Sequence, residues 1–286
     1  MKIKAYWDLL RLEHGIMYGI GVIIGIFVSD SSYFNIQNIV LGFFTALFLQ
    51  ASAFALNDYF DFEVDLANNR FDRPLVRGEI SKKEALIASL ILAPIGSLFA
   101  YLISFIAFTL AIFITTIGYI YDIKLKEYGL AGNFYIALSM AVPFLFGSVI
   151  AKSTFTFQAV ILALIAFLSG VGREIMKGIE DVEGDAIRNV KTIARMRGIK
   201  SAAFHASILF IASIVLSFIP FMLLKEYYLD FKYLFPIALT DAIFLKIAIE
   251  LIKLDESKVK QKIRNFRKQT LMAMSLGLVG FLLGAF

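Results

Sequence analysis

The 286-residue chain contains no cysteine and only two histidines. Without cysteine it forms neither disulfide bonds nor thiolate metal sites. His14 and His205 have no metal-ligating neighbours in the sequence, and we expect both to be structural. Charge is also scarce, because 18% of the residues are charged and 59% are hydrophobic, with a mean hydropathy of +0.77. This composition lies far from that of soluble globular proteins and predicts a membrane protein.

Nine apolar segments are long enough to cross a bilayer core, which takes about 20 residues. The run 85–120 is nearly continuous and too long for one span, with Ser104 as its only plausible turn. Residues 1–11 do not resemble a cleavable signal. The sequence therefore predicts an all-α polytopic membrane protein with a single domain over 1–286. Its expected spans are 9–29, 38–57, 85–103, 104–121, 131–151, 155–173, 202–224, 233–252 and 269–286.

The basic residues are distributed unevenly among the connecting segments. If the N-terminus is cytoplasmic, only four of the 28 Lys and Arg residues fall outside the cytoplasmic segments. Positive charge marks the cytoplasmic side of membrane proteins. We therefore predict a cytoplasmic N-terminus, an external C-terminus, and cytoplasmic loops at about 58–84, 122–130 and 174–201. The net charge of +5 reflects this topology and does not indicate nucleic-acid binding.

Two acidic clusters lie where apolar spans end. They contain the candidate metal ligands Asn57, Asp58, Asp61 and Asp65 in the first and Asp181 and Asp185 in the second. Spacings of four place Asn57, Asp61 and Asp65 on one helix face, and also the two residues of the second cluster. Carboxylates crowded in this way repel one another unless a cation lies between them. Oxygen-only ligands favour Mg²⁺, which in such settings usually carries substrate phosphate, and this predicts lipid chemistry at the membrane rim.

The two clusters also mark a weak internal repeat. Spans two and six each end in a cluster and continue into a long basic loop. Loops of this length are uncommon unless they are functional. We expect two four-helix halves and a ninth helix, with the two carboxylate sets holding a metal-bound diphosphate between them.

Cations beside the clusters are candidate ligands for phosphate groups. Arg70 and Arg73 follow the first cluster, and Arg188 and Lys191 follow the second. Arginine gives bidentate contacts to phosphate, whereas lysine acts as a point charge. An apolar bundle with 29 Phe and 12 Tyr can keep an allylic cation away from water.

Other charged residues have simpler interpretations. Glu63, Glu180 and Glu183 are expected to be solvated, and 253–268 to be an ordinary positive-inside loop that touches anionic headgroups. Three ionisable residues lie inside span 233–252, namely Asp241, Lys246 and Glu250. Such groups are functional candidates by default. Lys246 and Glu250 are four residues apart, so a local salt bridge explains that pair equally well.

The chain resembles the UbiA superfamily of intramembrane prenyltransferases over essentially its whole length. The first cluster matches the motif N-D-x-x-D-x-x-x-D, and Arg73 through Ser81 matches R-P-L-x-x-G-x-I-S. The second cluster matches D-x-x-x-D, with Arg173 and Glu174 upstream as is usual there. The resemblance implies a nine-helix fold, a central cavity open sideways to lipid, and Mg²⁺-dependent transfer of a prenyl group from its diphosphate.

Two further family patterns are matched only in part. Many members have Arg-Pro-x-Asn near the first span, whereas here Arg11 is followed by Leu-Glu-His. Members often have a Tyr followed four residues later by Lys, whereas Tyr121 is followed by Lys124 and Lys126. The resemblance implies a phosphate role for Arg11, a catalytic role for Tyr121, and a phosphate role for either lysine.

Within the superfamily, residues 173–185 are most similar to archaeal digeranylgeranylglyceryl phosphate synthases. This implies geranylgeranyl diphosphate as donor and the free hydroxyl of geranylgeranylglyceryl phosphate, a lipid acceptor, in ether-lipid synthesis. An aromatic acceptor of the 4-hydroxybenzoate type is the alternative. A transporter would place ionisable groups near the midplane, where Asp241 is one candidate. A CDP-alcohol phosphotransferase would need one contiguous motif that the chain lacks. The sequence leaves open the prenyl length, the number of Mg²⁺ ions, the base and the oligomeric state.

Overall fold

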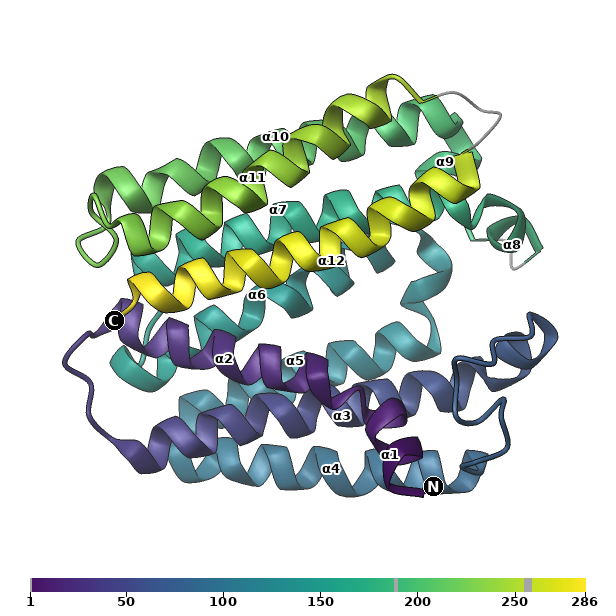
Figure 1. Ribbon diagram of the computed structural model, residues 1–286. Helices are drawn as coiled ribbons and strands as arrows, with labels where there is room; N and C mark the ends of the chain where they lie inside the picture. Colours follow the sequence, from purple (N-terminus) through teal and green to yellow (C-terminus); the bar gives the residue numbers. More distant parts are fainter. Residues whose placement is uncertain (1, 188–189, 255–258) are drawn as a thin grey trace.

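The structure, a computed structural model, describes residues 2–187, 190–254 and 259–286. Helices form nearly all of these ranges, which confirms the predicted all-α class (Figure 1). The helices of 18 or more residues within them are α2 (Leu12–Ser29), α3 (Ile36–Ala67), α4 (Lys82–Ile103), α5 (Phe105–Ile123), α6 (Leu130–Lys152), α7 (Phe157–Glu180), α10 (Ile199–Leu223), α11 (Phe231–Ile252) and α12 (Val259–Gly284). The short elements are α1 (Lys2–Leu10), η1 (Leu125–Tyr128), α8 (Val182–Ile187) and α9 (Ile193–Arg197).

Within the described ranges, seven of the long helices are long and apolar enough to cross a membrane. They are α2 to α7 and α10, and they agree with an integral membrane protein. The remaining two, α11 and α12, carry more charge, because α11 includes Asp241, Lys246 and Glu250 and α12 begins with several basic residues. The predicted count of nine spans and the internal repeat therefore stay predictions.

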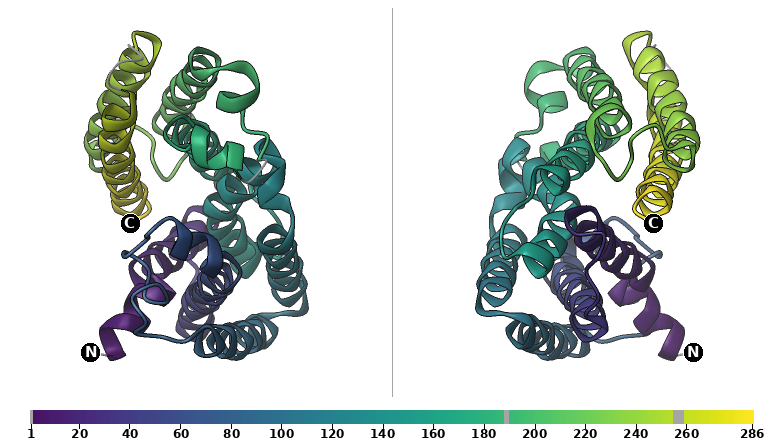
Figure 2. Two further views of the ribbon diagram at one scale, coloured as in Figure 1. Left: turned by 90° about the vertical axis from the view of Figure 1, so that its right-hand side faces the viewer. Right: turned by 90° about the vertical axis from the view of Figure 1, so that its left-hand side faces the viewer.

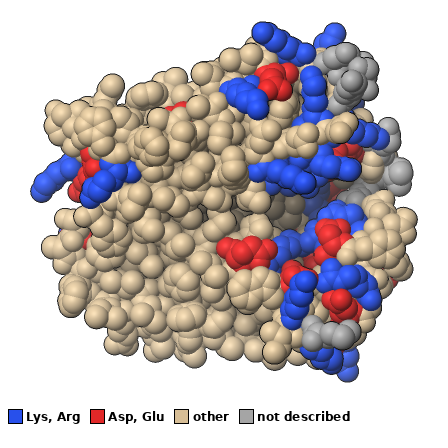
Figure 3. All heavy atoms as spheres, in the orientation of Figure 1, with Lys and Arg blue, Asp and Glu red and all other residues tan. Residues whose placement is uncertain are grey.

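The long helices lie side by side in one bundle, and Figure 2 shows them along their axes. α2 packs between α3 and α6, α7 packs against α6 and α10, and α12 packs against α11 and α7. The two termini lie at opposite ends of the bundle (Figure 1). Charged side chains gather at the end where α3 meets its following loop and where α8 and α9 lie (Figure 3). The uneven distribution of basic residues along the sequence thus corresponds to a charged end of the folded molecule.

Serine caps explain where α4 begins and ends. Ser81 and Glu84 form a capping box, in which each side chain accepts a hydrogen bond from the other residue's backbone N–H. Ser104 ends α4 with extended backbone, and its side chain accepts a hydrogen bond from Ala107 N at the start of α5. Such caps satisfy backbone donors that the first helical turn leaves free. The predicted turn at Ser104 is confirmed.

The predicted loops contain more helix than the sequence suggested. α3 continues ten residues beyond its apolar run, so the first acidic cluster is helical and only 68–81 connects α3 to α4. α7 likewise continues to Glu180, α8 and α9 follow within 174–201, and η1 lies within 122–130. Residues 259–268 form the first turns of α12, so the predicted 253–268 loop is wrong over that part. The physical reason is that a helix keeps its backbone hydrogen bonds after its side chains become polar.

Glycines allow α2 and α6 to pack closely. A Cβ at Gly25 would meet the backbone carbonyl of Phe144, and one at Gly147 would meet that of Val22. Backbone atoms of packed helices cannot move aside independently.

We therefore expect Gly25→Ala to lower the free energy of unfolding by about 1–3 kcal/mol, as overpacking commonly does. Thermal unfolding in detergent measures this change. The matched control is Gly178→Ala, whose new Cβ would contact Thr192 at an ordinary 3.6 Å. Equal melting temperatures for the two variants would contradict the close packing of α2 against α6.

Candidate active site

A cavity of about 500 Å³ lies at the centre of the bundle. Its lining residues come from α2, α3, α5, α6, α7, α10, α11 and α12 and from the loop after α3. The wall toward the charged end is formed by Arg11, Asn57, Asp72, Arg73, Asp122, Arg173, Glu174, Lys177 and Arg267. The remaining wall is largely apolar and includes Phe54, Phe144, Ile165, Phe244 and Phe281. The predicted central cavity is present, and its sideways opening to lipid stays a prediction.

Arg11 reaches this cavity from the junction of α1 and α2. It has left-handed backbone, with φ 44°, which breaks the helix and lets the chain change direction. Arg11 Nη2 lies 2.6 Å from Asp58 Oδ1, and its guanidinium lies 4.1 Å from the centre of the Phe54 ring. The residues after Arg11 differ from the family pattern, but Arg11 itself lines the cavity, and its phosphate role stays a prediction.

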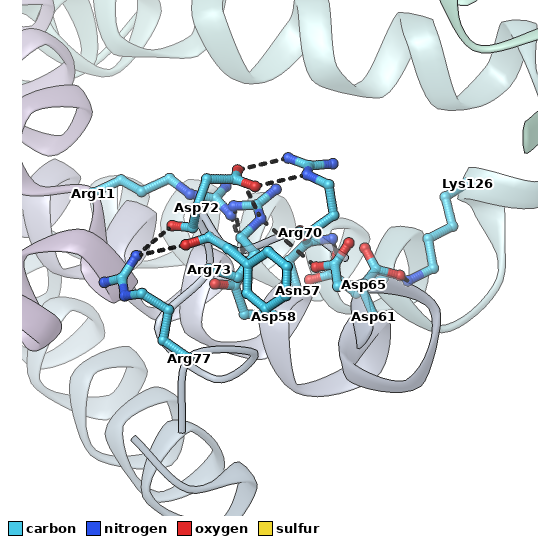
Figure 4. A network of polar contacts seen from close by, with 12 residues as sticks. Arg11, Asn57, Asp58, Asp61, Asp65, Arg70, Asp72, Arg73, Arg77 and Lys126 are labelled. Atoms are coloured by element: carbon cyan, nitrogen blue, oxygen red, sulfur yellow. Dashed lines mark hydrogen bonds and ion pairs between the residues drawn. The ribbon is translucent and has the colours of Figure 1, made fainter. Parts of the chain in front are cut away.

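Asp58 is buried beneath the first cluster, with 1% of its surface exposed. Its Oδ1 also lies 3.3 Å from Arg73 Nη1, so one carboxylate oxygen faces two arginines (Figure 4). Arg73 Nε in turn lies 3.6 Å from Asp65 Oδ2. Arg73 therefore links the buried Asp58 to the acidic face of α3.

The other members of that face also have partners from neighbouring elements. Lys126 Nζ, in η1, donates a 2.6 Å hydrogen bond to Asp61 Oδ1. Asn57 Nδ2 donates a 2.9 Å hydrogen bond to Asp122 Oδ1 at the end of α5. Each carboxylate of the predicted face is thus already neutralised by a cationic side chain (Figure 4).

Arg70 and Asp72 form a bidentate pair in the loop after α3, with two hydrogen bonds of 2.8 Å. The hydrogen bonds to Asp72 raise the pKa of Arg70, and the charges of Asp65 and Asp181 add to this. The same pair lowers the pKa of the Asp72 carboxyl. Asp181 follows the last residue of α7, and the convergence of the two acidic clusters on one diphosphate stays a prediction.

The second acidic cluster is described in part. Asp181 is exposed at the C-terminus of α7. Arg188 lies outside the described residues, as do the side chains of Asp185 and Glu183. Lys191 is exposed, and its backbone carbonyl packs against Gly129.

The candidate metal ligands on the described residues are carboxylate and amide side chains. Among them, no three His, Asp or Glu groups are placed to hold one metal ion. The donors are nevertheless all oxygens, as Mg²⁺ prefers. Lys126 and Arg73 supply positive charge at Asp61 and Asp65, where a bound cation would act. The donor chemistry fits Mg²⁺, and the predicted ligand set stays a prediction.

Only one of the two candidate lysines reaches the site. Lys124 is 61% exposed and lies 3.5 Å from Glu127, away from the cavity, whereas Lys126 binds Asp61. The tight η1 turn makes the side chains of Lys124 and Lys126 point in different directions. Their spacing in the sequence does not predict which of them contacts Asp61. Tyr121 lines the cavity, as expected for a site residue, and its ring stacks on Tyr135 with 4.7 Å between ring centres.

A second charged group at the cavity was not predicted as a site. We call it the α7–α12 cluster, formed by Arg173, Glu174, Lys177 and Arg267. Glu174 is 8% exposed and accepts hydrogen bonds from Lys177 at 2.7 and 2.9 Å and from Arg173 at 3.1 Å. The sequence signal for this group was the Arg173-Glu174 pair upstream of the second acidic cluster, which the family resemblance includes.

Glu180 joins α7 to α12 behind this cluster. It binds Arg267 at 2.8 Å and Arg264 at 3.2 Å, and its side chain is only 9% exposed. The prediction that Glu180 is solvated is therefore wrong, because α12 begins earlier than expected and covers it. Glu63, in contrast, is 72% exposed, as expected.

The remaining polar predictions have mixed outcomes. His14 lines the cavity and packs edge-on against Phe54, so it is placed at the site and not only in the core. Asp241 also lines the cavity and accepts a 2.7 Å hydrogen bond from Ser217. Lys246 and Glu250 lie 3.9 Å apart on the outside of α11, which confirms a local pair.

A helical membrane bundle with a central cavity, charged at one end and apolar elsewhere, has the features of a membrane-embedded enzyme for amphipathic phosphorylated substrates. The model of the UbiA prenyltransferase family matches residues 19–284. The chain belongs to this family of prenyltransferases.

Several relatives match the chain over its whole length. Digeranylgeranylglyceryl phosphate synthase of Archaeoglobus fulgidus is 54% identical over 284 residues, covering 99% of this chain and 96% of the relative. The enzyme of the same name from Pyrococcus furiosus is 32% identical over 285 residues, covering 100% and 98%. These are the proteins that the chain is similar to in sequence.

Solved structures agree on the fold. A structure described for digeranylgeranylglyceryl phosphate synthase in membranes is 33% identical, with a TM-score of 0.76 and coverage of 99% and 98% of the two chains. A UbiA homolog from Archaeoglobus fulgidus bound to DMAPP and Mg²⁺ is 19% identical, with a TM-score of 0.67 and coverage of 96% and 98%. At that identity the second likeness shows the fold alone.

Proposed function

We propose that this protein transfers a geranylgeranyl group from geranylgeranyl diphosphate to the free hydroxyl of geranylgeranylglyceryl phosphate, with Mg²⁺ as cofactor. The observation that carries the proposal is a central cavity that joins paired charged residues to an apolar interior. The full-length similarity to digeranylgeranylglyceryl phosphate synthases supports the acceptor. UbiA homologs bound to DMAPP or GPP with Mg²⁺ support the donor class and the metal. Family membership does not support a transporter or a CDP-alcohol phosphotransferase.

The cations of the site would bind the donor diphosphate. Arg73, Arg70 and Lys126 are now held by carboxylates and can transfer hydrogen bonds to phosphate oxygens when the substrate enters. Arg188 and Lys191 stay candidates for the same role from the other side. Arginine suits this task because its planar fork matches two phosphate oxygens.

The acidic residues would hold the metal at the same place. We assign ligand roles to Asn57, Asp61, Asp65, Asp181 and Asp185. Bound Mg²⁺ neutralises charge on the leaving diphosphate. Asp58 has a different role here, because its Oδ1 already binds Arg11 and Arg73. Its function would be to orient these two arginines toward the substrate.

The apolar part of the cavity would hold the prenyl chain and exclude water. Hydrocarbon leaves water favourably, so the isoprenoid enters this region while the diphosphate stays at the charged end. Loss of diphosphate leaves an allylic cation, and Tyr121 lines the cavity. An aromatic face attracts a cation by about 0.5–2 kcal/mol. We assign Tyr121 this role.

The orientation in the membrane follows from charge. On the face that Figure 3 shows, charged side chains gather at the end of the bundle where the loop after α3 and α8 lie, and the positive-inside rule assigns that end to the cytoplasm. The termini lie at opposite ends of the bundle (Figure 1). This supports nine crossings with a cytoplasmic N-terminus and an external C-terminus.

A direct assay tests the reaction. Purified protein is incubated with geranylgeranyl diphosphate, Mg²⁺ and either geranylgeranylglyceryl phosphate or 4-hydroxybenzoate, and the products are identified by mass. We expect a digeranylgeranylglyceryl phosphate and free diphosphate with the first acceptor only, and no product with excess EDTA. A prenylated 4-hydroxybenzoate as the main product would overturn the acceptor assignment. Intact donor carried across vesicle membranes without diphosphate release would overturn prenyl transfer.

A further inference from the structure

We infer that the α7–α12 cluster is a metal-independent site for the phosphate monoester of the acceptor, separate from the metal-dependent site for the donor diphosphate. This inference rests on the proposed function, because it assigns a position to the second phosphorylated substrate. The proposed reaction brings together two lipids that each carry phosphate. The charged end of the cavity has two parts, one wall that contains α3 and one formed by the α7–α12 cluster, and their charge balance differs.

The wall that contains α3 carries no surplus of positive charge. The charged residues of this wall that line the cavity are two cations, Arg11 and Arg73, and two carboxylates, Asp72 and Asp122. The carboxylates of the first cluster next to them, Asp58, Asp61 and Asp65, are paired with Arg11, Lys126 and Arg73. A diphosphate approaching this wall meets as many negative as positive groups. This wall needs a further cation to bind it, as the Mg²⁺ proposal requires.

The α7–α12 cluster has the opposite balance. Arg173, Lys177 and Arg267 line the cavity together with one carboxylate, Glu174. Glu180 and Arg264 behind it add one charge of each sign, so two positive charges remain in excess. A phosphate monoester carries close to two negative charges at neutral pH. The cluster can therefore neutralise it without a metal.

The excess positive charge of the α7–α12 cluster is largely buried, which points to a bound anion. Glu174 is 8% exposed, and the side chain of Arg173 is 15% exposed. Arg173 donates to Glu174 through Nη1, and its buried Nε has no hydrogen-bond partner among the described residues. A guanidinium carries five donors, and positive charge held away from water is costly unless an anion compensates it. These features favour an anionic ligand over a self-contained salt bridge.

The position also suits the acceptor. Lys177 and Arg173 precede Asp181 on α7 by four and eight residues, which is about 6 and 12 Å along the helix axis. In geranylgeranylglyceryl phosphate the accepting hydroxyl and the phosphate are on adjacent glycerol carbons. Phosphate bound by the α7–α12 cluster would therefore hold the hydroxyl in the same cavity as the donor carbon. Figure 1 shows α7 and α12 on one side of the bundle and α3 on the other.

The test uses a matched pair of arginines on α12. Arg267 and Arg264 both bind Glu180, but Arg267 lines the cavity, whereas the Arg264 side chain is 71% exposed. Binding of geranylgeranylglyceryl phosphate and of geranylgeranylglycerol, which lacks the phosphate, is measured by calorimetry in EDTA without donor. We expect the wild type and Arg264→Gln to prefer the phosphate ester by at least about 10-fold, as a charge-assisted contact allows. Arg267→Gln and Lys177→Gln should lose this preference.

Turnover gives a second readout with Mg²⁺ present. Arg267→Gln should raise KM for geranylgeranylglyceryl phosphate by about 10- to 100-fold and change KM for geranylgeranyl diphosphate less than about 3-fold. A wild type with no preference in EDTA, or cavity-lining variants that keep it, would overturn the site. So would an Arg267→Gln defect confined to the donor KM. Phosphate preference in a protein that transfers no prenyl group would retain the site and reject the proposed reaction.

Discussion

Replacing Asp61 by alanine is expected to lower kcat by about 10²- to 10³-fold while the protein stays folded. Loss of one electrostatic contact that stabilises a transition state commonly has an effect of this size. Asp61 lies on the acidic face of α3 and is only 23% exposed, with Lys126 as its partner. Steady-state kinetics with saturating donor and acceptor measure the change. Asp65→Ala, Asp181→Ala and Asp185→Ala are expected to behave in the same way.

Glu63→Ala is the matched control, since it removes a carboxylate two residues away on the same helix. Glu63 is 72% exposed, and its one ion-pair partner in the described part of the chain is Lys82, at 3.5 Å. We expect its kcat to stay within about twofold of the wild type, as usual for solvated pairs. Equal losses of kcat in Asp61→Ala and Glu63→Ala would show that kcat depends on the total negative charge of α3. They would contradict a special role for the acidic face of that helix.

Replacing Lys126 by glutamine is expected to lower kcat/KM for geranylgeranyl diphosphate by about 10- to 100-fold. Hydrogen bonds to charged groups contribute about 1.5–3 kcal/mol. Lys126 Nζ lies 2.6 Å from Asp61 Oδ1, and the lysine side chain is only 26% exposed. The kinetics are measured at several donor concentrations with the acceptor saturating, so that KM and kcat separate.

Lys124→Gln is the control for this change, because Lys124 faces Glu127 at 3.5 Å and is 61% exposed. We expect its kcat/KM to match the wild type within about twofold. If Lys124→Gln were the damaged variant and Lys126→Gln were unaffected, the geometry of η1 described above would be wrong.

The membrane fold and the first half of the site could be predicted because their signals are local. Apolar length reveals a span, and a spacing of four residues reveals which of Asn57, Asp61 and Asp65 share a face. Ser104 could be identified as a turn because it interrupts an unbroken apolar run. The helical ends of α3 and α7 could not be located in this way. Hydropathy reports where side chains stop being apolar, whereas a helix ends where its backbone hydrogen bonds end.

The second charged wall could not be predicted because it depends on tertiary packing. Arg267 is 87 residues from Glu180, and only the packing of α12 on α7 brings them together. Asp122 partners Asn57 across α5 and α3 for the same reason. A basic stretch beside an apolar span is typical of a positive-inside loop. For that reason Arg267 was not predicted to line the cavity. Only the charge balance of the folded cavity distinguishes the α7–α12 cluster from a solvated basic loop.

The central claim is that residues from α3 and from the end of α7 hold one diphosphate through divalent cations. Calorimetric titration of a non-reactive geranylgeranyl thiodiphosphate, with and without Mg²⁺, tests it most directly. We expect Mg²⁺-dependent affinity in the wild type and a loss of at least about 10-fold in Asp61→Ala and, independently, in Asp181→Ala. Wild-type affinity in either variant would contradict a diphosphate site shared by the two helices.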